Sequence, residues 1–370
     1  MFKKRSDIFD SNFVYFLILS IFIVIRIISS TFAINTVWGY VLNATIQIVL
    51  MFCLPMFFYS YLRKQKIKQT IKQYGFNKIN VKAIMLSLVI GILVYFITIF
   101  IATFFSAILN LLGYEKSSGS TMTSYPIWLF ILELIFTAVL PGICEEVANR
   151  GMMLSSYKKM GAKKAILLSG LLFGLMHLNI EQFFYASIIG FFFGFVALIT
   201  DSIYPTMIMH FTNNAMSTIM GFSIFHNLPL GTAINNFLTS ITSNNPFVSI
   251  LLIFALISII IFLLIFLSLQ LFKQTRVNQL TQMANEIMKN QLRKEIMGNL
   301  VEEENQEQNP NVEFNQQNIG SKKIFNVNFK NSILITNNLY KPTFKENIFL
   351  YVNLFMAITI TIFTFLWGVL

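Results

Sequence analysis

The sequence predicts an all-α fold, a polytopic membrane bundle of about nine transmembrane helices. Of the 370 residues, 55% are hydrophobic and only 12% are charged, whereas about one-quarter of the residues of a soluble domain are charged. A membrane-spanning helix needs about 20 predominantly apolar residues. The candidate stretches are Phe13–Ala33, Val41–Leu62, Ala83–Leu112, Ile127–Leu140 with its continuation, Ala165–Leu178, Phe183–Thr200, Tyr204–Phe222, Phe247–Phe272 and Ile348–Leu370.

The basic residues indicate how these spans are oriented. The net charge is +11, and Lys and Arg cluster beside spans in "MFKKRSD", "RKQKIKQTIKQ" and "KKMGAKK". Cytoplasmic loops carry an excess of Lys and Arg, so these segments are expected inside, with the N-terminus in the cytoplasm. Residues 221–246 hold no charged residue and are expected outside. The positive charge is thus explained by a multi-pass protein of the cell membrane in contact with the lipid bilayer, and no nucleic-acid partner is expected.

Composition divides the chain into consecutive parts. Residues 1–126 hold three spans and a basic cytoplasmic loop, and residues 127–222 hold four closely spaced spans with most of the unusual polar residues. Residues 223–272 are expected to form an outer loop and a span. Residues 273–347 are expected to form a polar cytosolic tail that begins as an amphipathic helix, and residues 348–370 form the last span.

Two adjacent glutamates are the most unusual feature of the central spans. Ionisable residues inside a membrane are costly and often functional. Glu145 and Glu146 follow Pro141, near which a helix is expected to begin. Residues four apart share a helix face, so Arg150 is expected to neutralise Glu146, which would then be structural. Glu145 is left to face another helix, and Glu133 has no assigned role.

Three further polar residues are expected near the depth of Glu145. The turn "KKMGAKK" lies between Glu145 and His177. Glu145 precedes the first lysine of this turn by as many residues as His177 follows its last lysine. If both flanks are helical, the two side chains lie at matching depth on antiparallel helices. His210 lies on the seventh span, with Asn214 one turn further on the same face. These four side chains can converge inside the bundle.

A carboxylate, two imidazoles and an amide suit the hydrolysis of a peptide bond. That reaction requires an activated water, a stabilised oxyanion and a protonated leaving amine. Glu145 would act as the base, and the imidazole and amide groups would donate to the oxyanion. Alternatively, Glu145, His177 and His210 would bind Zn²⁺ and lower the pKa of its water. A transporter would need polar residues in the outer halves of the sixth and seventh spans, which are mostly Phe, Ile, Met and Ala.

Three motifs occur in order along this region. "EEVANRG" fits EExxxR, "FGLMH" from Phe173 to His177 fits FxxxH, and "HFTNN" from His210 to Asn214 fits HxxxN. In order and separation they resemble the CPBP family of intramembrane proteases. This family includes the CAAX prenyl endopeptidases and bacteriocin-immunity or abortive-infection proteins. The resemblance covers about residues 127–222.

The resemblance implies an intramembrane endopeptidase that cleaves a membrane-associated or cytoplasmic-side peptide or protein. Glu145 would activate water with His177 beside it, and His210 and Asn214 would bind the carbonyl oxygen. Family members are often called metalloproteases, but a metal-free glutamate mechanism has been argued for some, so Zn²⁺ stays open. The alternative is a non-catalytic membrane protein of the same family that gives bacteriocin self-immunity or regulates another membrane protein. The intact set of motif residues favours the enzyme.

Overall fold

The computed structural model describes residues 6–31, 36–115, 123–242, 246–308 and 340–369, and all regular elements in these ranges are helices. The predicted all-α class is therefore confirmed. In these ranges, seven helices are long and apolar enough to cross a membrane. They are Asp7–Ser29, Trp38–Arg63, Val81–Leu111, Ile127–Met160, Ile180–Thr200, Val248–Asn290 and Phe344–Val369.

The other two predicted spans also form helices at their expected positions. Helix α9 (Ala162–Met176) has only 15 residues, which is short for a span. Helix α11 (Tyr204–Phe225) has 22 residues, but polar side chains such as His210 and Asn214 reduce its mean hydropathy. α9 packs against α10 (Ile180–Thr200), and α11 packs against α5 (Val81–Leu111). The prediction of about nine spans is consistent with this arrangement.

The N-terminal region contains the first three spans. Their elements are α1 (Asp7–Thr31), then α2 (Thr36–Thr45), η1 (Ile46–Phe58) and α3 (Tyr59–Arg63) in one continuous span, then the short α4 (Ile67–Gln73) and α5. Element η1 is a π-helix that contains Pro55. A π-helical turn accommodates a residue that cannot donate to the regular helical ladder. Thus the second span continues through its proline.

The fourth span also continues through a proline, so the expected helix start near Pro141 is wrong. It runs from Ile127 to Met160. Its elements are α6 (Ile127–Glu133), η2 (Leu134–Val139), α7 (Leu140–Glu146), η3 (Val147–Leu154), α8 (Ser155–Tyr157) and η4 (Lys158–Met160). Proline normally breaks a helix because it lacks an N–H. Here the π-helical η2 precedes it, and groups on neighbouring helices can bond the freed carbonyl.

Helices α9 and α10 form a tight hairpin. The chain reverses through Leu178, whose φ is 50°, and the Asn179 side chain caps α10 by accepting from the Glu181 N–H at 2.7 Å. A Cβ on Gly190 would lie 2.9 Å from the Cα of Gly170. Small residues at both positions therefore let the two helices approach closely.

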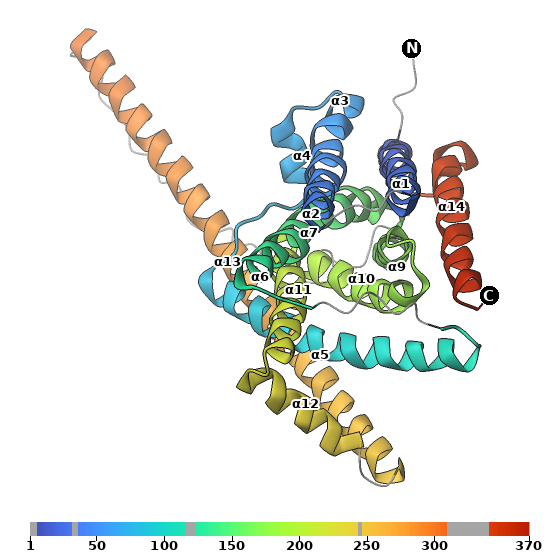
Figure 1. The fold of residues 1–370 in the computed structure, drawn as a ribbon. Coiled ribbons are helices and arrows are strands. Elements are labelled where there is room, and N and C mark those ends of the chain that lie inside the picture. The colour runs from blue at the N-terminus through green and yellow to red at the C-terminus, as the bar shows by residue number, and fades with distance from the viewer. Residues whose placement is uncertain (1–5, 32–35, 116–122, 243–245, 309–339, 370) are drawn as a thin grey trace.

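In the C-terminal region the structure describes residues 223–242, 246–308 and 340–369, and the rest of the expected polar tail lies outside the described residues. The expected outer loop contains helix α12 (Pro229–Thr242), and α13 (Pro246–Gln308) continues unbroken from the membrane span into the polar tail. Figure 1 shows α13 extending far beyond the other helices. The last helix, α14 (Phe344–Val369), packs beside α1. The first and last spans are therefore neighbours.

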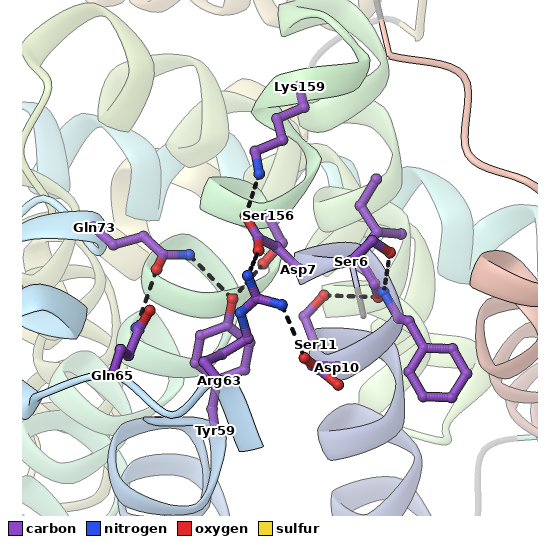
Figure 2. A network of polar contacts seen from close by, with 12 residues as sticks. Ser6, Asp7, Asp10, Ser11, Tyr59, Arg63, Gln65, Gln73, Ser156 and Lys159 are labelled. Atoms are coloured by element: carbon purple, nitrogen blue, oxygen red, sulfur yellow. Dashed lines mark hydrogen bonds and ion pairs between the residues drawn. The ribbon is translucent and has the colours of Figure 1, made fainter. Parts of the chain in front are cut away.

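Side chains of the segments expected in the cytoplasm contact one another (Figure 2). Arg63 at the end of α3 and Lys159 in η4 both contact Asp7 at the start of α1. The Nζ of Lys158 lies 3.6 Å from the Oδ1 of Asp201, which follows α10. The N-terminal helix start and the ends of the second, fourth and sixth spans thus lie on the same side, as the predicted alternation requires.

Candidate active site

Four ionisable side chains share a buried position near the centre of the bundle. Glu145 and Glu146 end α7, Arg150 follows in η3, and His210 lies on α11. Their exposed fractions are 7%, 0%, 2% and 6%. Figure 1 shows α7, α9, α10 and α11 grouped together here. Such a buried group is stable only if each charge has a close partner.

A glycine brings the two main elements of the site together. A Cβ on Gly142 of α7 would lie 2.9 Å from the backbone nitrogen of Phe211 on α11. The absence of a side chain at residue 142 therefore allows close backbone contact. Because Gly142 precedes the glutamates by one turn and Phe211 follows His210, this contact places the carboxylates against the imidazole.

The Oε1 atom of Glu146 has two partners. The Nη1 of Arg150 donates to it at 2.7 Å, which is the ion pair predicted from the four-residue spacing. The Nδ1 of His210 lies 2.9 Å from the same oxygen. Because an ionised carboxylate can only accept, Nδ1 carries the hydrogen. Glu146 therefore orients His210 as well as pairing with Arg150, a second partner that the sequence did not predict.

Glu145 has one neutral partner and one open oxygen. Its Oε1 accepts from the Nε2 of Gln47 at 2.8 Å. Its Oε2 is buried and, within the described residues, makes no hydrogen bond, although the Nε2 of His210 lies 3.9 Å away. Gln47 belongs to η1 in the second span, outside the region where the motifs occur. Its only signal in the sequence is a lone amide in the apolar stretch "TIQIVLMF".

The FxxxH motif supplies an aromatic wall to the site. The guanidinium of Arg150 lies 4.5 Å from the ring centroid of Phe173, within cation–π range. The same ring meets the rings of His177 and His210 edge-on, at centroid distances of 5.4 and 5.7 Å. The structure therefore places His177 beside the site, in contact with the ring of Phe173.

Asn214 is bound to the fourth span. Its Nδ2 donates to the backbone carbonyl of Thr137 at 3.0 Å. In a regular α-helix that carbonyl would accept from the N–H at residue 141, but residue 141 is proline. Asn214 thus adds a side-chain donor to a carbonyl in the π-helical turn just before Pro141. Only the second amide hydrogen of Asn214 remains for a substrate oxygen, and its Oδ1 accepts from the Nδ2 of Asn213 at 3.0 Å.

The predicted zinc site requires three donor atoms that point to one position. In the part of the chain that the structure describes, no three His, Cys, Asp or Glu side chains are arranged to hold a metal ion. His210 directs Nδ1 to Glu146, and Glu145 directs Oε1 to Gln47. The remaining nitrogen of His210 and the remaining oxygen of Glu145 lie 3.9 Å apart, and His177, beside Phe173, does not complete a three-ligand set with them in this arrangement. The Zn²⁺ alternative from the sequence stays untested.

Glu133 belongs to a separate cluster. Its Oε1 accepts from the hydroxyl of Tyr40 at 3.2 Å, and its Oε2 accepts from the hydroxyl of Tyr125. Burial, together with the Glu133 carboxylate, raises the pKa of Tyr125 well above its usual value. The backbone carbonyl of Tyr125 in turn contacts the Nε2 of His226 at 2.7 Å. These contacts join α2, α6 and the end of α11, at the opposite end of the bundle from Asp7.

The fold and site define a multi-pass membrane protein with a buried glutamate–histidine site between its spans. Residues 126–216 match the family described as type II CAAX prenyl endopeptidase, Rce1-like. This segment contains all three motifs, so the match confirms the resemblance predicted from the sequence and supports membership of the CPBP family. No curated protein and no solved structure shows a significant match to the chain.

Proposed function

We propose that this protein is an intramembrane endopeptidase that hydrolyses a peptide bond of a membrane-associated or cytoplasmic-side peptide. The single observation that carries the proposal is the open Oε2 of Glu145, buried and 3.9 Å from the Nε2 of His210. A buried carboxylate oxygen with no donor is costly unless a ligand or water completes it. A water at this position can contact both the base and the imidazole.

Glu145 supplies the base. Its Oε2 takes one proton from the water while the water oxygen bonds to the carbonyl carbon of the substrate. The carbonyl oxygen becomes an oxyanion. Glu145 then returns the proton to the amide nitrogen, the carbon–nitrogen bond breaks, and a carboxylic acid and an amine leave. The proton taken from water is therefore the proton delivered to the leaving group.

His210 supplies the electrophilic side of the site. Because Nδ1 is directed to Glu146, Nε2 is the ring atom that faces Glu145 and the substrate. A proton on Nε2 makes it a donor to the oxyanion, and the Glu146 carboxylate stabilises the resulting imidazolium. Arg150 prevents Glu146 from being left as an uncompensated buried charge. The aromatic rings of Phe173 and Phe193 enclose these groups and exclude bulk water, which strengthens each electrostatic contact.

The orientation in the membrane is part of the proposal. The end of the bundle that carries Arg63, Lys158 and Lys159 is assigned to the cytoplasm, because basic residues accumulate on the inner side. The N-terminus is then cytoplasmic, and a peptide reaches Glu145 from that side.

Membrane proteomics with wild type and Glu145→Gln tests the function. The substitution keeps the side-chain volume and removes the base, so peptide termini that depend on the wild-type protein should disappear. Glu181→Gln, a change at the start of α10 away from the site, is the matched control and should retain those termini. If wild type and Glu145→Gln give the same termini while both confer the same immunity or regulatory effect, the non-catalytic alternative holds.

A further inference from the structure

The proposed base is held from outside the segment that matches the family. Gln47 lies on the second span, yet its Nε2 donates to the Oε1 of Glu145 at 2.8 Å. It lies in the first turn of η1, and its exposed fraction is 6%. An amide buried in a span costs free energy unless its polar atoms are used. The Glu145 carboxylate provides an acceptor for the NH₂ group of this side chain.

The chemistry of the pair determines how the amide is oriented. An ionised carboxylate only accepts hydrogen bonds, so the NH₂ group of Gln47 must face it. The amide oxygen then points away, and the Oε1 of Gln47 is a buried atom without a hydrogen-bond partner in the described residues. The open atoms of this pair are thus two acceptors, Oε1 of Gln47 and Oε2 of Glu145, as expected where a water or a substrate N–H will bind.

The two adjacent glutamates therefore have partners of different kinds. Glu146 contacts a guanidinium and an imidazole, which can balance its charge. Glu145 is held by an amide, which donates one hydrogen bond but carries no charge and cannot take up a proton. An amide can orient a carboxylate without neutralising it. This difference leaves the open oxygen of Glu145 available to a water.

We propose that Gln47 is a positioning residue that binds Oε1 of Glu145 and so presents Oε2 to the water. The inference rests on the proposed function and deepens it, because it makes the second span part of the active site. Residues 126–216, which match the family, then hold an incomplete site. Loss of the Gln47 contact should let the carboxylate rotate, and misplacement of a reacting group by about 1 Å can reduce the rate about 100-fold.

The test compares Gln47→Leu with Thr45→Val in purified full-length protein. Leucine removes the donor and nearly keeps the volume, whereas Thr45 is exposed on the same span and bonds to the Val41 carbonyl of its own helix. For Gln47→Leu, kcat should fall about 10- to 100-fold with little change in KM. The acidic limb of its pH–activity profile should move to higher pH, because the lost donor favoured the ionised carboxylate. Thr45→Val should match wild type in both.

A second variant keeps the test possible if Gln47→Leu does not fold. Gln47→Asn keeps a polar amide in the span but shortens its reach, and it should show the same loss of kcat and the same shift of the acidic limb. Unchanged kcat and pH profile in the folded variants, with wild type active and Glu145→Gln inactive, would overturn the inference and leave the proposed function intact.

An inactive wild type would instead overturn the proposed function. The contact between Gln47 and Glu145 is then tested by a double-mutant cycle on thermal unfolding with Gln47→Leu and Glu145→Leu. Coupled effects would support the contact, and additive effects would exclude it.

Discussion

The Nδ1 of His210 lies 2.9 Å from the Oε1 of Glu146, the same oxygen that accepts from Arg150 at 2.7 Å. One buried carboxylate thus holds both a structural cation and a histidine that faces the proposed base. The spacing of residues along one helix indicates only the first of these contacts. The second links the EExxxR motif to the HxxxN motif across two helices, and it changes what a substitution of Glu146 is expected to do.

Glu146→Gln should impair both stability and catalysis. An uncompensated charge at Arg150 should lower the free energy of unfolding by about 3–5 kcal/mol. In the fraction that folds, kcat should fall about tenfold or more, because His210 loses the carboxylate that orients it. Thermal unfolding and activity per folded molecule measure the two effects separately. Glu133→Gln is the control within the same span. Normal kcat in folded Glu146→Gln would mean that Glu146 serves Arg150 alone.

Asn214 and Pro141 should be coupled through the carbonyl of Thr137. Asn214→Ala leaves that carbonyl without its side-chain donor and should cost about 1–3 kcal/mol of stability. Pro141→Ala restores a backbone N–H at the position that bonds this carbonyl in a regular helix. The double variant should therefore recover part of the stability lost in Asn214→Ala, measured by thermal unfolding. A loss of activity in Asn214→Ala without any loss of stability would instead assign the amide to the oxyanion alone.

The ion-pair network in Figure 2 should stabilise the packing of α1 on the second span. Arg63 contacts Asp7 and lies 3.1 Å from Asp10, whose exposed fraction is 1%. Arg63→Ala removes the guanidinium from both carboxylates and should destabilise by about 3–5 kcal/mol. Lys159→Ala removes an exposed cation from Asp7 and should cost at most about 1 kcal/mol. Equal effects of the two substitutions on the unfolding midpoint would contradict the distinction between buried and exposed pairs.

The two ends of the bundle should face opposite sides of the membrane. In a background without Cys53 and Cys144, Lys163→Cys should react with an impermeant thiol reagent only when the cytoplasmic side is accessible. Asn235→Cys on α12 should react from outside. A cysteine at Glu303 in α13 should behave as Lys163→Cys does, because the chain crosses the membrane once between α12 and residue 303. Labelling of this site from outside would overturn the proposed orientation.

Activity should survive chelation. The described side chains do not converge on a metal position, and Glu145 with His210 can move the required proton by themselves. Mass spectrometry of the purified protein is expected to find no stoichiometric zinc, with full activity after treatment with a chelator. Stoichiometric zinc that is lost together with activity, and that is absent from His177→Ala, would establish the metal mechanism instead.

The sequence by itself determined the class of fold, the position of the helices and the local contacts of the site. Hydropathy locates membrane spans because a long apolar segment must form a helix in the bilayer. The pair of Glu146 and Arg150 follows from helix periodicity, since residues four apart share a face. The hairpin between α9 and α10 follows from the short polar connection at Asn179. The motifs indicated a resemblance to a family, and the family match over residues 126–216 confirmed this resemblance.

Only the tertiary structure decided which side chains meet across helices. Periodicity shows which face a residue occupies, but not how neighbouring helices are rotated or how far each side chain reaches. Hence the contacts of Gln47 with Glu145, of His210 with Glu146 and of Asn214 with Thr137 could not be predicted. Pro141 misled the sequence prediction for the same reason. The carbonyl of Thr137, in the turn before this proline, accepts from a side chain more than seventy positions later in the chain, and only packing brings the two together.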